Sequence, residues 1–196
     1  VRVTIRGALR AGVRVRDLIH HIIADIGPEA ADYRAVEFTG PTVSAMGVND
    51  RMILCGVVVE IGAKTALIAP DEVAFEYLRG RAQWDFAAVQ NDPDAEFERE
   101  YSYDAAEVEV MLAAPPAPDN VVPLSTVAGT RIDSAYIGTC ASGTIEELRD
   151  AARVLEGRKV HPDVMALVVP STQETFRQAA EEGLLTVLIE SGCHIL

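Results

Sequence analysis

The sequence is poor in cations and has no long hydrophobic run. Seventeen lysines and arginines stand against thirty aspartates and glutamates in 196 residues, a formal net charge of −13. Because nucleic-acid binding depends on clustered cations that neutralise phosphates, we expect no nucleic-acid partner. The longest uncharged apolar run, Met52 to Val59, is far shorter than the roughly 20 residues of a membrane-spanning helix. We therefore expect no membrane partner either.

Cysteine is also scarce, with Cys55, Cys140 and Cys193 spread along the chain. An odd number of distant cysteines does not fit a secreted disulfide framework. Reduced thiols, free or metal-bound, and a cytoplasmic location fit better. What remains is typical of a globular protein, with 49% hydrophobic and 24% charged residues. The chain starts at Val1 without a methionine and stops at Leu196 just after an apolar stretch, so we expect it to be a piece of a longer protein.

Periodicity in the first half predicts one helix and several strands. Apolar residues recur at the spacing of one helix face from Val15 to Ile26, and Gly27 and Pro28 then end the helix. Short apolar or alternating runs predict strands at Val1 to Ile5, Ala35 to Phe38 and Thr65 to Ile68. A less regular alternation over Tyr101 to Met111 predicts one more strand, at a sheet edge. The first half is therefore mixed α/β.

A proline-rich stretch divides the chain. Residues 113–119 read AAPPAPD, which suits neither a helix interior nor a central strand. We therefore expect one domain over 1–113, a linker over 114–120 and a second domain over 121–196. The second half predicts alternating strands and helices: Ser134 to Ile137, helix Ile145 to Leu155, Met165 to Val169, helix Gln173 to Glu182, and Thr186 to Ile189. This β-α-β-α-β order indicates a parallel sheet. Capping boxes are expected at Thr144 with Glu147 and at Ser171 with Glu174.

Ligands of open parallel sheets bind at the carboxyl ends of the strands, where two loops lead directly into helices. The first loop, from Gly138 to Gly143, places Cys140 beside a helix N-terminus that would lower the pKa of its thiol. Cys140 is a candidate nucleophile or metal ligand; the alternative is a buried small apolar residue. The second loop carries Ser171 and Thr172, whose hydroxyls suit a carboxylate or phosphate. The alternative there is plain helix capping.

A third candidate is Glu60, the one ionisable residue in the run MILCGVVVEI that starts at Met52. A carboxylate in apolar surroundings is costly unless it is paired or functional. The alternative is that Glu60 marks the exposed end of the buried segment and pairs with Lys64 four residues on. Cys55, inside the same run, is expected to pack as an apolar residue.

Three longer motifs carry a resemblance to a known family. They are EIGAKTALIAPDE from Glu60, YIGTCASGTIEELRDAA from Tyr136 with the continuation GRKVHPDV, and LLTVLIESGCHIL at the end. In order and spacing the chain resembles the central region of large subunits of the aconitase superfamily, in the 3-isopropylmalate dehydratase and homoaconitase branch. The resemblance implies two aconitase-like α/β subdomains, 1–113 similar to the second domain of the family and 121–196 to an incomplete, cluster-binding third domain.

The resemblance also implies an activity. The family members are hydro-lyases that isomerise a 2-hydroxy polycarboxylate by dehydration and rehydration, using a [4Fe-4S] cluster with one open iron. Cys140 falls on a cluster cysteine and Glu60 on an active-site glutamate. Ser142 and Ser171 fall in loops near the substrate, Ser171 by a looser match. The expected partners are a small polycarboxylate and a small subunit that carries a swivelling domain.

The sequence departs from the family at several positions. Ala141 to Thr144 replace the usual Thr-Asn-Gly-Arg after the cluster cysteine, and Gly56 replaces a common asparagine. The Cys-x-x-Cys pair expected after Leu196 is not in this sequence, so we expect the isolated chain to be inactive. Two alternatives stay open. One is a noncatalytic α/β binding module that has lost the cluster, and the other is a thiol enzyme with Cys140 as nucleophile, for which no local motif supplies a base.

Overall fold

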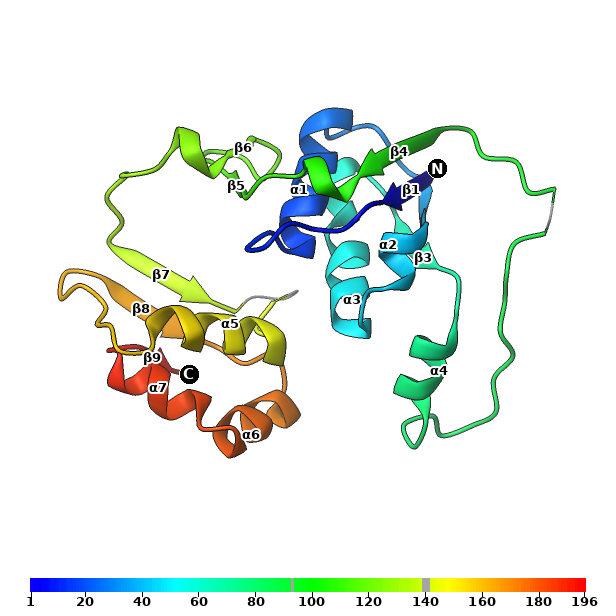
Figure 1. Ribbon diagram of the computed structural model, residues 1–196. Helices are drawn as coiled ribbons and strands as arrows, with labels where there is room; N and C mark the ends of the chain where they lie inside the picture. The colour runs from blue at the N-terminus through cyan, green and yellow to red at the C-terminus, as the bar shows by residue number, and fades with distance from the viewer. Residues whose placement is uncertain (93, 139–141) are drawn as a thin grey trace. The chain divides into compact units, whose positions relative to one another are not determined.

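The computed structural model describes residues 1–92, 94–138 and 142–196, so Cys140 lies outside the described residues. The chain forms two compact units, Val1–Ala128 and Gly129–Leu196 (Figure 1). The proline-rich segment 114–120 lies within the first unit, where it joins strands β5 (Met111–Ala113) and β6 (Val121–Pro123) of an antiparallel pair. The division between the compact units therefore falls after this segment, at Ala128.

The first unit is built on a parallel sheet with strand order β3-β2-β1-β4. Its strands are β1 (Arg2–Arg6), β2 (Ala35–Thr39), β3 (Thr65–Ile68) and β4 (Glu100–Asp104). All four were predicted, and β4 lies at a sheet edge as expected. It ends earlier than the alternation indicated, because the Asp104 side chain accepts a hydrogen bond from the Ala106 amide and starts the 3-10 turn η2 (Ala105–Glu107).

Helix α1 (Val15–Ile26) matches its predicted bounds and buries an apolar stripe. The stripe consists of Leu18, Ile19, Ile22 and Ile23, all at most 1% exposed. The unit also contains the helices α2 (Pro41–Ser44), α3 (Val48–Gly56) and α4 (Glu72–Leu78) and the 3-10 segments η1 (Val57–Ile61) and η3 (Leu124–Thr126). The apolar run from Met52 to Ile61 is thus helical. It packs into the same core as β1 and β2.

A buried carboxylate joins the antiparallel pair of β5 and β6 to the rest of the first unit. Asp17, 8% exposed, accepts hydrogen bonds from the amide of Arg14 at 2.7 Å and from the amide of Met111 at 2.9 Å. The first bond caps α1 and the second holds the start of β5 against that helix. One side chain therefore satisfies two backbone donors that are 97 positions apart, which offsets the cost of its burial.

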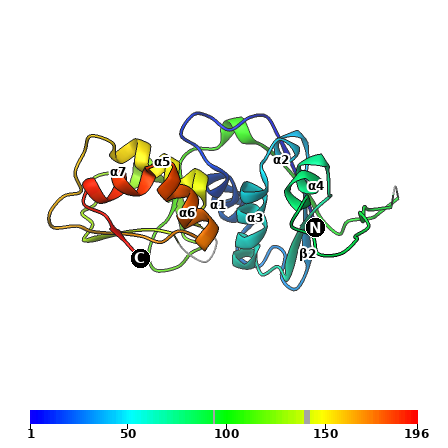
Figure 2. The same cartoon turned by 90° about the horizontal axis from the view of Figure 1, so that it is seen from below.

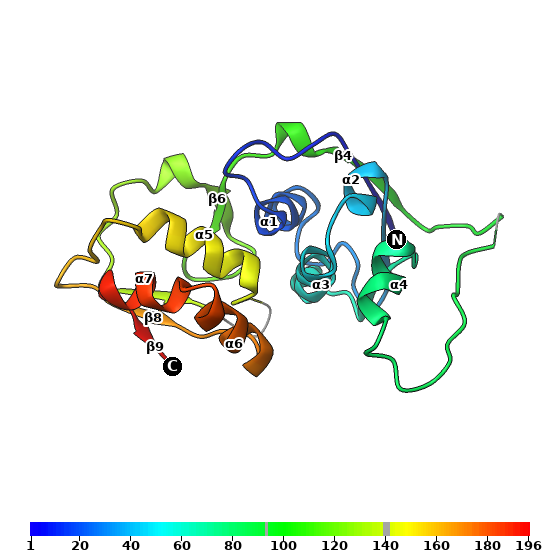
Figure 3. The ribbon, with the colours of Figure 1, turned by 60° about the horizontal axis from the view of Figure 1, so that its bottom comes forward.

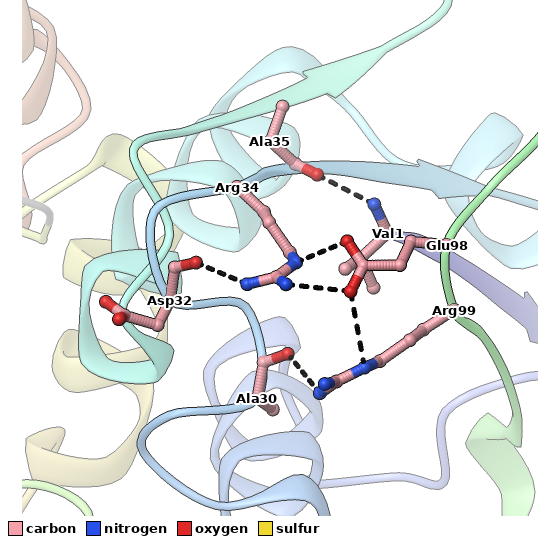
Figure 4. Close-up of polar contacts among 7 residues, drawn as sticks. All are labelled: Val1, Ala30, Asp32, Arg34, Ala35, Glu98 and Arg99. Carbon is pink, nitrogen blue, oxygen red and sulfur yellow. Dashed lines mark hydrogen bonds and ion pairs between the residues drawn. The ribbon is translucent and has the colours of Figure 1, made fainter.

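The segment that leads from α4 back to β4 is anchored at its far end (Figure 4). Glu98 accepts two hydrogen bonds from Arg34, at 2.6 and 2.7 Å, just before β2 begins. Arg99 donates to the carbonyl of Ala30 at 3.0 Å, and the Val1 amino group donates to the carbonyl of Ala35 at 2.9 Å. These contacts bring the starts of β1, β2 and β4 together. Because the strands are parallel, their carboxyl ends lie together at the opposite end of the sheet.

The second unit has a three-stranded parallel sheet of order β7-β8-β9. In chain order its elements are β7 (Ser134–Ile137), α5 (Ile145–Leu155), β8 (Met165–Val168), α6 (Gln173–Glu181), α7 (Leu184–Glu190) and β9 (His194–Ile195). The predicted α/β class with parallel strands is confirmed. All three helices lie on one face of this sheet, which is seen nearly edge-on in Figure 2 and from a second direction in Figure 3.

The predicted strand Thr186 to Ile189 is wrong, because these residues belong to helix α7. The third strand is His194–Ile195 instead. Gly183, in the left-handed conformation, begins α7, and Leu188 is fully buried in the core of the unit. Short apolar runs have no periodicity that distinguishes a strand from a buried helix, so packing decides between them.

Candidate functional site

Two loops meet at the carboxyl ends of β7 and β8. The amide of Ser171, which follows β8, donates a hydrogen bond to the carbonyl of Gly143, which precedes α5, at 2.9 Å. The approach is close enough to require glycine: a Cβ atom on Gly143, whose φ is +80°, would lie 2.4 Å from the Val169 carbonyl oxygen. The structure therefore brings Ser142 and Ser171, the two predicted substrate-binding residues, into adjoining loops.

The Ser142 side chain is engaged within its own loop. Its Oγ lies 2.8 Å from Oε1 of Glu147, to which it donates a hydrogen bond. The other oxygen of the same carboxylate accepts from the Thr144 amide at 3.0 Å and lies 3.2 Å from the Thr144 hydroxyl. The predicted capping box of Thr144 and Glu147 is confirmed. Glu147 thus holds the polar groups of both Ser142 and Thr144 on the approach to α5.

The second predicted capping box is wrong, because Thr172 rather than Ser171 is the N-cap of α6. The Thr172 hydroxyl accepts a hydrogen bond from the Thr175 amide at 3.0 Å. Thr172 has the extended backbone, φ −147° and ψ 163°, that an N-cap requires. Ser171 is left one residue outside the helix, exposed to solvent, with its hydroxyl 3.2 Å from the Thr175 hydroxyl.

Cys140, the predicted metal ligand, lies outside the described residues. Among the residues that the structure describes, no group of three or more His, Cys, Asp or Glu side chains could hold a metal ion. Cys55 and Cys193 are free thiols, and burial raises the pKa of each, that of Cys55 to about 11. Both pack against apolar cores. The described residues therefore do not by themselves form a cluster site.

Glu60 lies in η1 of the first unit. Its neighbours Val58 and Ile61 are buried, while Glu60 is half-buried. Within the described ranges its carboxylate has no hydrogen bond or ion pair, and the Lys64 ammonium lies 4.1 Å above the Tyr33 ring instead. The alternative prediction, an ion pair between Glu60 and Lys64, is therefore not confirmed in the part of the chain that the structure describes. A half-buried carboxylate without a described partner is available to bind a ligand.

A buried arginine of the first unit was missed in the sequence. Arg51, 6% exposed, donates to both oxygens of Asp71, at 2.8 and 2.7 Å. It also donates to the carbonyls of Met46 and Ser44, each at 3.0 Å. The hydrogen bond from Arg51 lowers the pKa of the Asp71 carboxyl. The available signal was the lone cation that opens the apolar run, together with an aspartate at the start of α4.

Comparison with known proteins places these features in a family. A profile of the aconitase family (aconitate hydratase) matches residues 1–196. The chain belongs to the aconitase family. It is 42% identical over 194 residues to the 3-isopropylmalate dehydratase large subunit 1 of Methanopyrus kandleri, covering 99% of this chain and 46% of that protein. It is 39% identical over 191 residues to a probable methanogen homoaconitase large subunit of Methanosarcina mazei, covering 97% of this chain and 48% of that protein.

A third relative agrees with these two. The 3-isopropylmalate dehydratase large subunit of Halothermothrix orenii is 42% identical over 189 residues, which cover 96% of this chain and 45% of that protein. The chain therefore spans about half the length of the curated relatives it matches. None of the helices in the described part of the chain is long and apolar enough to span a membrane.

Proposed function

We propose that this aconitase-family chain is the central part of the large subunit of an iron-sulfur hydro-lyase, a 3-isopropylmalate dehydratase or homoaconitase. The observation that carries the proposal is 42% identity over 99% of the chain to a 3-isopropylmalate dehydratase large subunit. That similarity extends through both compact units and both strand-end loops. The reaction is the isomerisation of a 2-hydroxy polycarboxylate by dehydration and rehydration, in the dehydratase a step of leucine biosynthesis.

The complete protein is proposed to hold a [4Fe-4S] cluster, with Cys140 as one thiolate ligand and the other cysteines outside this sequence. When bound, the cluster supplies a Lewis-acidic iron for the substrate's hydroxyl and carboxylate. The chain's own catalytic group is Glu60, whose half-buried carboxylate can take up or release a proton. Ser142 and Ser171 bind substrate oxygens at the carboxyl ends of β7 and β8.

The net charge of the chain supports a substrate site that is completed by other parts of the protein. A chain with a net charge of −13 offers few cations to neutralise a polycarboxylate. We therefore propose that the remaining cations come from the rest of the large subunit and from a small subunit with a swivelling domain. Residues 1–113 would correspond to the second family domain and 121–196 to part of the third, and the isolated chain would be inactive. Free thiols at Cys55 and Cys193 are in keeping with a cytoplasmic location.

The test uses the full-length protein that contains this chain, purified anaerobically and mixed with its small subunit. Bound iron and acid-labile sulfide are measured first, followed by dehydration of 3-isopropylmalate and of homocitrate. We expect about four irons per large subunit and turnover of one of the two substrates. Cys140→Ser should abolish iron retention, whereas the control Cys193→Ser, at a buried position in the apolar core, should retain it. Full iron content and turnover in Cys140→Ser would remove that residue from the site.

A noncatalytic binding module is the second candidate. It is favoured by the replacement of polar family residues by Ala141 and Gly56, which removes possible contacts to cluster or substrate. In this case the full-length protein would purify without iron and without dehydratase activity, yet would still bind a polycarboxylate in calorimetric titration. Iron content therefore separates the two candidates before any kinetic measurement.

A further inference from the structure

The Ser142 hydroxyl has a defined hydrogen-bond polarity. A serine hydroxyl has one proton to donate and two lone pairs with which to accept. The proton of Ser142 is directed to Oε1 of Glu147 at 2.8 Å, and a carboxylate can only accept. As long as this bond is present, Ser142 Oγ can offer a ligand only its lone pairs.

Glu147 is itself held in place, so the polarity does not depend on a single contact. Its second oxygen accepts from the Thr144 amide at 3.0 Å, and its own amide donates to the Thr144 hydroxyl at 3.4 Å. Rotation of the carboxylate away from Ser142 would break the capping box of α5, which stabilises the start of that helix. The acceptor state of Ser142 is thus coupled to the start of the helix.

Ser171, in the adjoining loop, has the opposite freedom. Its Oγ lies 3.2 Å from the Thr175 hydroxyl, which lies 3.0 Å from the Thr172 hydroxyl. Thr175 can donate to Ser171 while it accepts from Thr172, and this arrangement leaves the Ser171 proton available to a ligand. Ser171 can therefore donate to a carboxylate, which Ser142 cannot do without losing Glu147.

We propose that Glu147 is a positioning residue that makes Ser142 a hydrogen-bond acceptor, so that Ser142 Oγ accepts a hydrogen bond from the substrate's hydroxyl while Ser171 donates one to a substrate carboxylate. The inference rests on the proposed function, because it assumes a hydroxy polycarboxylate at these two loops. It adds an assignment of substrate atoms to side chains: hydroxyl to the first loop and carboxylate to the second. A ligand without a hydroxyl gains nothing from Ser142.

The test compares two ligands in the full-length holoenzyme. One is the substrate that the enzyme dehydrates, 3-isopropylmalate or homocitrate, equilibrated beforehand with a catalytic amount of enzyme, and the other is the analogue of that substrate without its hydroxyl, which is isopropylsuccinate in the case of 3-isopropylmalate. Affinities are measured by anaerobic calorimetric titration, and the quantity of interest is the ratio of the two affinities. Ser142→Ala should lower this ratio about fivefold, the size of one hydrogen bond, and leave the binding of the analogue without a hydroxyl unchanged. Ser171→Ala should weaken the binding of both ligands and leave the ratio of their affinities unchanged.

Glu147→Gln tests the positioning role, because an amide can donate to Ser142 as well as accept from it. We expect the ratio to fall several-fold. Thr144→Ala is the matched control: it removes the capping hydroxyl of the same helix but keeps the bond between Ser142 and Glu147. It should lower the unfolding temperature to a similar extent without changing the ratio.

The outcomes separate the inference from the proposed function. A wild-type protein that binds neither ligand would overturn both. A protein that contains iron, dehydrates its substrate and shows the same ratio in Ser142→Ala as in wild type would overturn the inference alone. If Glu147→Gln and Thr144→Ala had the same ratio of the two affinities, the role of Glu147 would be that of a helix cap alone.

Discussion

Arg51 and Asp71, twenty positions apart, form a bidentate ion pair that joins two helices of the first unit. The Arg51 side chain is 7% exposed and the Asp71 side chain 37% exposed, with N–O distances of 2.8 and 2.7 Å. Asp71 is also the N-cap of α4, where it accepts from the Ala74 amide at 3.2 Å. The remaining Arg51 hydrogen bonds end at the backbone of Ser44 and Met46. One side chain thus ties the end of α2 to the start of α4.

Loss of Arg51 should be costly for the stability of the first unit. Arg51→Ala removes the ion-pair partner of Asp71 and the donor to the carbonyls of Ser44 and Met46, so we expect the free energy of unfolding to fall by roughly 2–4 kcal/mol. Urea unfolding followed by circular dichroism measures the change. Arg79→Ala is the control, since the ion pairs of Arg79 with Glu72 and Glu76 are exposed, and should change stability by less than about 1 kcal/mol. Equal effects of the two variants would contradict the structural role of Arg51.

The same pair predicts a dependence of stability on pH. The pKa of Asp71 is lowered in the folded protein, first by the hydrogen bond from Arg51, so its contribution is fully present above the unfolded-state pKa of about 3.9. It is lost as the pH falls through the lower folded-state value. Asp71→Asn should therefore remove part of the acid-induced loss of stability below about pH 4. Unfolding midpoints of Asp71→Asn and wild type, measured at several pH values between neutral and acidic, would reveal this difference. Midpoints that fall in parallel for the two proteins as the pH is lowered would argue against it.

Cys55 should be nearly unreactive in the native protein. Burial raises the pKa of its thiol to about 11, against an ordinary value of 9.0. At neutral pH the reactive thiolate is then about 100-fold rarer than for a free thiol. Alkylation by iodoacetamide, followed by peptide mass spectrometry, should label Cys55 slowly in the folded protein and rapidly in urea. Labelling of native Cys55 at the rate of free cysteine would place this thiol outside the core.

Glu60→Gln tests the proposed catalytic carboxylate. The amide keeps the shape of the side chain but cannot exchange a proton, so we expect kcat of the full-length enzyme to fall by a factor of about 10²–10⁴. Iron content and the affinity for the substrate analogue without a hydroxyl should stay the same. Glu29→Gln, at an exposed glutamate of the same unit, serves as control. An unchanged kcat in Glu60→Gln would make Glu60 a structural residue.

The sequence predicted much of the framework, because the signals involved are local. Residues Val15 to Ile26 contain both the stripe of α1 and its termination at Gly27, and Thr144 with Glu147 contain the whole cap of α5. Where the prediction failed, the deciding partner lay elsewhere. The run before Ser191 became helix α7 because Leu188 packs into the core of the second unit. At the second strand-end loop, Thr172 took the capping position one residue beyond Ser171.

The candidate site divides in the same way. Residue types and motifs were enough to single out Glu60, Ser142, Ser171 and Cys140, since the resemblance depends on order and spacing along the chain. Only the tertiary structure places Ser171 beside Gly143, directs the Ser142 hydroxyl to Glu147 and leaves Glu60 without a described partner. Hydrogen-bond polarity and burial are set by which atoms meet once the chain is folded. Periodicity and capping, by contrast, are properties of neighbouring residues, which the sequence by itself determines.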